Sequence, residues 1–316
     1  MEYRHVGRSG LKVSTIALGS WLTYGEGVDD DTAVSCIHTA FELGVNYFDT
    51  ANVYQGGVAE KVLGKALKSL PRSSYVLATK AYWPVSDGPN DRGLSRKHLF
   101  EQVHQSLRRL GTDYVDMFFC HRYDKETPLE ETLRALEDLV RDGKVLYPGV
   151  SEWTADQMAH ALRIADQRSY DRIVVDQPVY SMLNRGIEKE ILPLAEREGL
   201  GLVVFSPLAQ GVLTGKYRRG QPAPAGSRGA DPRLSRMVEG QLTDRTYDAV
   251  EAIEKVAGDL GVELAQVALA WTLRHEAVSC AITGASRVEQ VRTNVAAADL
   301  KLDEATLARI EGILAA

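Results

Sequence analysis

The chain contains, at residues 114–121, the stretch Tyr114-Val115-Asp116-Met117-Phe118-Phe119-Cys120-His121, which is apolar along most of its length and ends in an imidazole. Two earlier stretches have the same form. Residues 45–49 end in a carboxylate, Asp49, and residues 75–80 end in an ammonium, Lys80. Burying such groups at the tip of a strand costs free energy. In a barrel of parallel strands, the carboxyl ends of neighbouring strands ring one mouth. The three stretches therefore predict one shared site.

Strand-like and helix-like segments alternate from one end of the chain to the other. Strands are predicted near residues 14–19, 46–50, 75–80, 114–120, 145–151, 173–180, 201–208 and 278–284. Helical patterns are predicted near residues 31–43, 58–69, 96–110, 128–142, 155–167, 185–198 and 287–298. Several strands are continuous apolar runs, as expected when both faces of a parallel sheet are covered. The alternation predicts an α/β protein with the (β/α)₈ architecture of a TIM barrel, formed as one domain by residues 1–316.

Capping residues support these boundaries. Residues 127–130 read as a capping box with proline at the first helical position, and residues 154–157 repeat the box. Ser95 is expected to cap the helix that follows it. Four of the helices are expected to end at a left-handed glycine, namely Gly44, Gly111, Gly143 and Gly199.

Two segments interrupt the alternation. Residues 1–13 read as a small β-hairpin that is expected to plug the bottom of the barrel. Residues 209–240 are rich in glycine, proline, serine and arginine and lack periodicity, and they follow the seventh strand. A loop of this length in a compact domain is usually functional, so we expect it at the mouth. Two helical patterns near residues 242–259 and 263–274 come next, and one of them is expected to be an extra helix near the C-terminus.

Composition excludes several classes of protein. The chain has 37 basic and 43 acidic residues and a net charge of −6, with no basic run suited to a nucleic-acid backbone. The three cysteines lie far apart without metal-like spacing, which is typical of a reducing cytoplasm rather than of a disulfide framework. We find no apolar signal core and no stretch of about 18 apolar residues, so neither secretion nor membrane insertion is expected.

The polar groups at the strand ends suggest a chemistry. Lys80 is expected to be buried, and Asp49 is the carboxylate that would keep it charged. Tyr54 is expected to have its pKa lowered by the ammonium and by the imidazole of His121, which would make it a general acid. His121 would donate a second hydrogen bond to the same substrate oxygen. The predicted reaction centre is a carbonyl that becomes an alkoxide, with electrons supplied by another molecule.

Each of these residues also has a purely structural interpretation. Asp49 and Lys80 could be only a buried ion pair that holds the barrel mouth together. Tyr54 alone would be an amphipathic surface ring, and His121 alone a core histidine. A metal-dependent hydrolase on the same barrel is a further alternative, but no second histidine or carboxylate lies close to His121 in the sequence, so no metal is expected. His98 and His104 lie in a helical pattern and are expected to be exposed.

These residues resemble the catalytic tetrad of the aldo-keto reductases, and the resemblance covers essentially the whole chain. It is carried by Phe48-Asp49-Thr50-Ala51 with Tyr54, by Thr79-Lys80, by His121, and by Gly56, Glu60 and Leu63-Gly64. Residues 93–98, 114–116 and 205–209 are similar to the branch that contains the voltage-gated potassium-channel β-subunits and their bacterial relatives. The resemblance implies a barrel that binds NADPH without a Rossmann fingerprint. It also implies that Tyr54 is the proton donor, that Lys80 lowers its pKa, that Asp49 pairs with Lys80, and that His121 orients the carbonyl.

The resemblance further implies residues for the nicotinamide and pyrophosphate. Ser151 and Gln177 match the pair that hydrogen-bonds the carboxamide, and Phe205 matches the ring that stacks on the nicotinamide. The pyrophosphate path would be lined by Ser206, Leu208 and Gly211, and the loop's phosphate ligands would be Lys216 and Arg228.

Residues 284–294 resemble the family's adenosine-phosphate motif. The side chains expected near the 2′-phosphate are Ser286, Arg287 and Gln290, with Asn294 at the adenine. A hydroxyl, a guanidinium and a helix N-terminus together suit an anion. The family commonly has glutamate directly before the asparagine, whereas this chain has Thr293, which weakens one adenine contact but leaves the phosphate ligands, so NADPH is expected over NADH.

Two functions remain open at this point. The first is an NADPH-dependent reductase of aldehydes or ketones, for which Trp21, Tyr24 and Trp83 are expected to line an aromatic substrate pocket. The second is an NADP(H)-binding regulatory subunit with slow or no turnover. The channel subunits lack histidine at the fourth tetrad position, so His121 favours the reductase. The physiological substrate is not specified by these residues, and neither is homo-oligomer formation.

Overall fold

The computed structural model describes residues 1–25 and 27–315, and its centre is a closed barrel of parallel strands. The strands are β3 (Ile16–Gly19), β4 (Tyr47–Asp49), β5 (Val76–Ala81), β6 (Val115–Cys120), β7 (Val145–Ser151), β8 (Val175–Gln177), β9 (Gly201–Val204) and β10 (Val278–Thr283). They pair in chain order, and β10 closes the barrel against β3. The eight predicted strands and the TIM-barrel fold class are confirmed.

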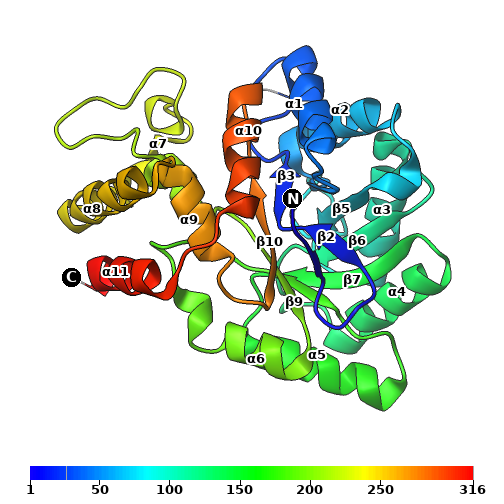
Figure 1. Cartoon of the computed structure of the whole chain (residues 1–316). Coiled ribbons are helices and arrows are strands. Elements are labelled where there is room, and N and C mark those ends of the chain that lie inside the picture. The colour runs from blue at the N-terminus through cyan, green and yellow to red at the C-terminus, as the bar shows by residue number, and fades with distance from the viewer. Residues whose placement is uncertain (26, 316) are drawn as a thin grey trace.

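Helices surround the barrel, as Figure 1 shows. Those that match predicted patterns are α1 (Asp30–Glu42), α2 (Val58–Leu67), α3 (Arg96–Leu110), α4 (Leu129–Arg141), α5 (Ala155–Arg168), α6 (Ile191–Glu198) and α10 (Val288–Ala296). Between β9 and β10 lie α7 (Ser235–Glu239), α8 (Asp244–Leu260) and α9 (Leu264–Thr272). Of these, α9 packs against β10 and α10, whereas α8 packs outside it against α9 and α11 (Glu304–Ala315). The expected extra helix is therefore α8, and α11 is a helix that the sequence patterns missed.

A hairpin closes the bottom of the barrel, as predicted. Its strands β1 (Tyr3–His5) and β2 (Lys12–Ser14) pair antiparallel. Val6 and Val13 are fully buried in a cluster with inward-facing strand residues such as Met117. Gly7, at the turn, has φ +56, and a side chain there would place its Cβ 2.3 Å from the Gly199 carbonyl oxygen. The hairpin therefore seats on the barrel only because this turn has no side chain.

Two of the three predicted N-caps are confirmed. The Ser95 hydroxyl accepts the His98 backbone N–H at the start of α3, and Thr154 forms a capping box with Gln157 at the start of α5. The box predicted at residues 127–130 is wrong. The helix begins one residue later than predicted, so Pro128 is the N-cap of α4 and has no cap hydrogen bond, and the Thr127 hydroxyl donates to Asp124. The predicted glycine ends are confirmed by left-handed φ values, for example +69 at Gly111.

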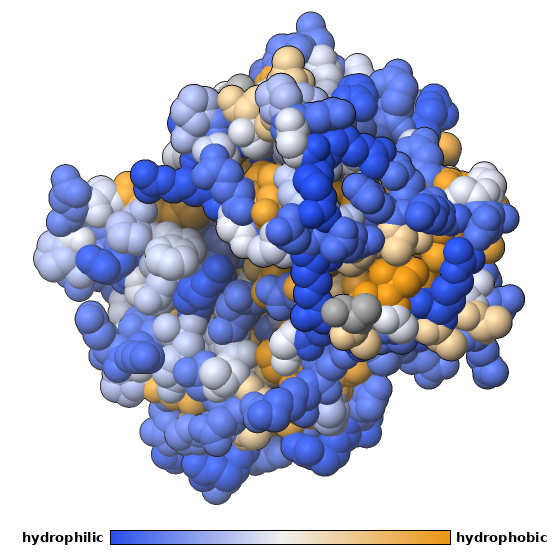
Figure 2. All heavy atoms as spheres, turned by 90° about the vertical axis from the view of Figure 1, so that its left-hand side faces the viewer, coloured by the Kyte–Doolittle hydropathy of each residue, from blue (hydrophilic) through white to orange (hydrophobic). Residues whose placement is uncertain are grey.

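Residues 209–240 follow β9 and contain two short 3₁₀ turns, η4 (Ala209–Thr214) and η5 (Arg228–Ala230), before α7. Ion pairs tie this segment to α8: Arg218 pairs with Glu254 at 2.6 Å, and Arg219 pairs with Asp248 at 2.5 Å. Figure 2 shows the side of the molecule that carries α8 and α11, where polar side chains predominate and apolar atoms are visible in the hollows. Within the described residues, no helix combines the length and apolarity that crossing a membrane requires.

Candidate active site

Barrel register brings the predicted strand-end residues together. Asp49 is the last residue of β4, Lys80 lies near the end of β5, and His121 directly follows β6. These strands are consecutive neighbours in the barrel, so their carboxyl ends share one part of the mouth. Tyr54 comes from η1 (Tyr54–Gly57), the turn between β4 and α2, rather than from a strand end.

The Lys80 ammonium is the centre of the cluster. It is completely buried and donates to Asp49 Oδ1 at 2.5 Å, to the Thr50 carbonyl at 2.8 Å, and to the Tyr54 hydroxyl at 3.3 Å. Burial alone would lower the pKa of Lys80, but the charge of Asp49 and these hydrogen bonds outweigh it and raise the pKa above its usual value. The expectation that Asp49 keeps Lys80 charged is confirmed.

The expectation that the pKa of Tyr54 is lowered is wrong for the free protein. Burial is the largest influence and raises the pKa of Tyr54 above 10.0, while the Lys80 charge pulls it down and the Asp49 charge pushes it up. Burial and the Asp49 charge together outweigh the Lys80 charge, so the buried phenol keeps its proton. Tyr54 is therefore protonated at neutral pH and can donate its proton, and the neighbouring Lys80 ammonium can stabilise the phenolate that results.

His121 lies beside Tyr54 as a neutral imidazole. The two rings are edge-on, with centroids 5.9 Å apart. Burial, followed by the charges of Lys80 and Arg122, lowers the pKa of His121 well below 6.5. Its Nδ1 is buried without a hydrogen-bond partner among the described residues. A neutral imidazole carries one N–H, so His121 can donate one hydrogen bond to an oxygen placed beside Tyr54.

Sequence reasoning missed part of the support for Asp49. Its Oδ2 accepts from Gln177 Nε2 at 2.9 Å and from the Tyr47 hydroxyl at 3.2 Å. Tyr47 is two residues before Asp49, so strand alternation places both inside the barrel, and this signal could have found it. The Gln177 side-chain amide, expected at the carboxamide, donates to Asp49, and the Ser151 hydroxyl donates to the Gln177 backbone carbonyl at 2.8 Å.

Two of the three expected pocket aromatics lie beside the cluster. The Trp21 ring centroid is 6.5 Å from that of Tyr54, and the Trp83 centroid is 6.3 Å from that of His121. Tyr24 does not line this space. It is 1% exposed and packs in the hydrophobic core, so its predicted place in the pocket is corrected.

Three cations gather on the side of the mouth formed by the segment after β9 and by the start of α10. Desolvation, and then the charges of Arg228 and Arg287, lower the pKa of Lys216. Arg228 bonds Gln210 and lies 5.8 Å from the Trp21 ring centroid. Within residues 1–25 and 27–315, no carboxylate pairs with any of the three cations. This excess of positive charge fits a bound polyanion.

The backbone after β9 is shaped for close approach. Ser206, Ala209 and Gln210 all have positive φ, at 53°, 47° and 58°. Gly211 has φ +93, and a Cβ there would lie 2.8 Å from Lys216 Nζ. Phe205 and Leu208, in the same turn, are partly exposed. A run of strained residues of this kind costs free energy and commonly marks a ligand site.

The start of α10 adds a second anchor. The Ser286 backbone N–H donates to Gln290 Oε1 at 2.8 Å and its hydroxyl donates to the same atom at 3.1 Å, while Arg287 precedes the first helical residue. Asn294 is buried on the same helix. Thr293, where the family commonly has glutamate, donates to Glu263 at 3.3 Å, so the carboxylate of the residue that precedes α9 lies beside this position.

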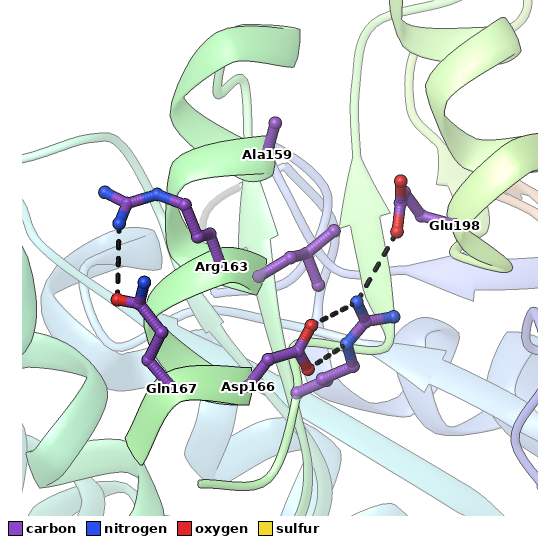
Figure 3. Close-up of a pocket in the computed structure, with 7 residues that line it drawn as sticks. Ala159, Arg163, Asp166, Gln167 and Glu198 are labelled. Atoms are coloured by element: carbon purple, nitrogen blue, oxygen red, sulfur yellow. Dashed lines mark hydrogen bonds and ion pairs between the residues drawn. The ribbon is translucent and has the colours of Figure 1, made fainter. Parts of the chain in front are cut away.

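A separate shallow pocket lies between α5 and α6 on the outside of the barrel, as Figure 3 shows. Its charged groups satisfy one another: Arg172 pairs with Asp166 at 2.7 Å and with Glu198 at 3.5 Å, and Arg163 donates to Gln167 at 3.2 Å. The ends of α5 and α6 that carry these groups lead into the next strands, so they lie at the bottom of the barrel, opposite the mouth. We assign this pocket no chemistry.

The closed parallel barrel and the Asp49–Lys80–Tyr54 cluster with His121 place the chain in a known class. A sequence model described as Aldo/keto reductase family matches residues 15–315, and the chain belongs to that family. It is 44% identical over 95% of its length to a probable voltage-gated potassium channel subunit beta of Arabidopsis thaliana, of which 92% is covered. A putative subunit of that name from Schizosaccharomyces pombe is 45% identical over 99% of this chain and 93% of that protein. A probable subunit from Oryza sativa subsp. japonica is 43% identical over 95% and 92%.

Family membership supports oxidoreduction with a nicotinamide cofactor, NAD(P)H. The residues of this chain fit such a group: cations without counter-charges, a left-handed glycine and a helix N-terminus lie on one side of the mouth, and a proton donor lies beside them. The predicted resemblance to the channel-subunit branch is confirmed.

Proposed function

We propose that this protein is an NADPH-dependent reductase that converts aldehydes or ketones to alcohols, formed as a single domain. The observation that carries the proposal is the buried chain of hydrogen bonds from Asp49 through Lys80 to the Tyr54 hydroxyl, beside a neutral His121. The arrangement suits a carbonyl oxygen that gains negative charge, because it offers a proton, a hydrogen-bond donor and a nearby positive charge.

The side chains have separate roles in this proposal. NADPH, when bound, supplies the hydride. Tyr54 transfers its proton to the carbonyl oxygen, and the Lys80 ammonium 3.3 Å away stabilises the phenolate that remains. His121 donates a hydrogen bond that orients the carbonyl, and Asp49 holds Lys80 in place. Trp21 and Trp83 would line the substrate space beside the Tyr54 and His121 rings.

For the cofactor we propose NADPH over NADH. Ser151 and Gln177 would hydrogen-bond the carboxamide, and Phe205 would stack on the nicotinamide ring. In this arrangement the Gln177 side-chain amide would contact both the carboxamide and Asp49, to which it already donates. The pyrophosphate would lie along the turn after β9 with its cations, and the adenosine 2′-phosphate at the start of α10. The residues proposed for these two phosphate regions are Ser206, Leu208, Gly211, Lys216, Arg228, Ser286, Arg287 and Gln290, with Asn294 at the adenine.

Replacement of one hydroxyl tests the proposal. In Tyr54→Phe we expect aldehyde reduction, followed by loss of NADPH absorbance, to fall by about 10²–10⁴-fold because the general acid is removed. NADPH binding, measured by fluorescence titration, should remain. The matched control is Tyr24→Phe, which removes a buried hydroxyl without a hydrogen-bond partner among the described residues, and which should reduce the aldehyde at the wild-type rate. Full activity in Tyr54→Phe would overturn the proposal.

A second function is favoured by the names of the relatives. The similar proteins of A. thaliana, O. sativa and S. pombe are described as subunits of potassium channels. A regulatory subunit would bind NADP(H) and report its redox state to a partner, with slow turnover over a broad carbonyl panel. Rapid reduction of any member of the panel argues against this function, whereas tight NADPH retention without turnover argues for it. Gel filtration of the cofactor-bound protein tests whether it forms homo-oligomers.

A further inference from the structure

We propose that Arg122 makes this site selective for carbonyl substrates that carry a carboxylate. The inference rests on the proposed reductase function and adds the class of substrate. Arg122 directly follows His121 in the sequence and is partly exposed at the mouth of the barrel. Neither its type nor its position is required by the hydride-transfer chemistry.

The geometry places the Arg122 guanidinium against the pocket aromatics. Its Nη1 donates to the His121 carbonyl at 2.5 Å, and its central carbon lies 5.5 Å from the Trp83 ring centroid. The Trp83 ring is itself 6.3 Å from the His121 ring, and 40% of Trp83 is exposed. A substrate that reaches His121 past Trp83 therefore meets this guanidinium on its way.

Arg122 has no counter-charge of its own. No carboxylate among the described residues pairs with it. Asp124 is only two residues away, but its oxygens accept from the Leu94 and Glu126 backbone N–H groups and from the Thr127 hydroxyl. Asp124 thus shapes the loop rather than neutralising the arginine.

The rest of the reacting centre leaves this charge uncompensated. Lys80 and Asp49 pair at 2.5 Å and cancel one another, and His121 is neutral because its pKa is low. Arg122 is therefore the positive charge that a substrate bound at Tyr54 would meet on this side. The cations proposed for the cofactor come from the segment after β9 and from α10, whereas Arg122 follows β6.

The remaining hydrogen-bond donors of Arg122 suit a carboxylate. Only Nη1 is used within the described residues, so the edge formed by Nε and Nη2 stays available. A guanidinium edge matches the two oxygens of a carboxylate, and the Trp83 face holds the guanidinium plane. If Arg122 served only to pack against Trp83, a long apolar side chain would replace it without a change in substrate preference. The two interpretations therefore predict different kinetics.

The experiment compares para-carboxybenzaldehyde with its neutral methyl ester, which has the same ring and aldehyde but no charge, and each substrate is compared between the variant and the wild-type protein. In Arg122→Met we expect kcat/KM for the acid to fall by about 10–100-fold, the value for one lost charge-assisted pair, mainly through KM. The ester should be reduced as by the wild-type protein. Arg122→Lys should recover part of the preference. The matched control is Lys125→Met, which removes an exposed charge from the same loop and should leave both substrates unaffected.

The outcomes are separable. An equal loss for acid and ester in Arg122→Met, or no loss for either, overturns the role of Arg122 while the reductase stands. If the wild-type protein reduces neither compound, the proposed reductase is wrong. Quenching of tryptophan fluorescence by para-carboxybenzaldehyde still decides the binding role in that case: weaker quenching in Arg122→Met than in Lys125→Met supports it, and equal quenching overturns it.

Discussion

At the scale of single residues, the central feature is a phenol whose pKa is determined by opposing influences. Burial raises the pKa of Tyr54, the Lys80 charge lowers it, and the charge of Asp49, which pairs with Lys80, raises it again. A nearby ammonium therefore does not by itself make a tyrosine acidic. The Lys80 ammonium stabilises the phenolate as it forms during proton transfer, which is the stage at which stabilisation increases the rate.

These pKa directions predict the pH dependence of reduction. The reaction needs Tyr54 protonated and, because its pKa is raised, this form persists until the pH exceeds the ordinary tyrosine value of about 10. His121 has a lowered pKa and stays neutral as the pH falls through about 6.5. We expect kcat/KM for a neutral aldehyde to be constant between about pH 6.5 and about pH 10, and to decline only above about pH 10, where Tyr54 loses its proton.

The measurement is a pH profile of kcat/KM, with circular dichroism at each pH to confirm that the protein stays folded. The residual activity of Tyr54→Phe should show no alkaline decline, which identifies the titrating group. A decline of the wild-type rate at neutral pH would contradict the raised pKa.

Much of the candidate site was predictable because strand ends are easy to recognise. Apolar runs that stop at Asp49, Lys80 and His121 indicate where the chain reaches the mouth. The pKa of Tyr54 was not predictable, because its sign depends on how burial compares with two opposing charges. The availability of Arg122 was also hidden, since only the folded loop shows that Asp124 is occupied elsewhere.

At the scale of elements, the helix starts show that a cap depends on where the helix begins. Thr154 and Thr127 stand in similar sequence patterns, yet only Thr154 caps its helix. The N-cap of α4 is Pro128, one residue after Thr127, and the Thr127 hydroxyl donates to Asp124. A local motif predicts a cap only where the helix begins at the residue that the motif assumes.

Thr154→Ala should lower the free energy of unfolding by about 1 kcal/mol, because the Gln157 backbone N–H loses its acceptor. The matched control is Thr154→Ser, which retains a hydroxyl and should stay close to the wild-type value. Urea denaturation followed by circular dichroism measures both variants. Equal stability of the alanine and serine variants would show that the box contributes nothing.

Helix faces were predicted less well than helix positions. His98 was expected to be exposed but is fully buried on α3, whereas His104 is exposed as expected. Gln102 lies on the same buried face, where it accepts from Asn52 at 2.9 Å. A buried helix face that contains polar residues is not recognised from the spacing of apolar residues in the sequence. The helix α11 was missed for a related reason, because Ile310 is its one buried residue in the described chain and Glu311 docks it to Arg185 and Trp271.

At the scale of the whole molecule, the long segment of residues 209–240 links the proposed cofactor site to the outer helices. It contributes Lys216 and Arg228 to the cationic side of the mouth, and Arg218 and Arg219 attach it to α8. Most of its length has no regular secondary structure. Charge pairs attach it to α8, and buried side chains such as Leu213, Tyr217 and Val238 pack it into the hydrophobic core.

We expect NADPH to protect residues 216–228 from trypsin, because phosphates would engage Lys216 and Arg228 and hold the backbone between them. Mass spectrometry of timed digests measures cleavage after these residues with and without cofactor. Cleavage after the exposed Lys125 serves as the control and should not change. NADH at the same concentration should protect less, since it lacks the 2′-phosphate. Unchanged cleavage within the segment on adding NADPH would contradict its role in binding.

The hairpin at the bottom of the barrel has a consequence for how the protein is made. Arg4 Nη1 donates to the Leu273 carbonyl at 2.8 Å and to the Val278 carbonyl at 2.9 Å, and β3 completes its pairing only against β10. Until β10 has left the ribosome, β3, the first strand of the barrel, therefore has one unpaired edge. Such an edge can pair with strands of other chains. That risk ends only once β10 has been synthesised and has paired with β3.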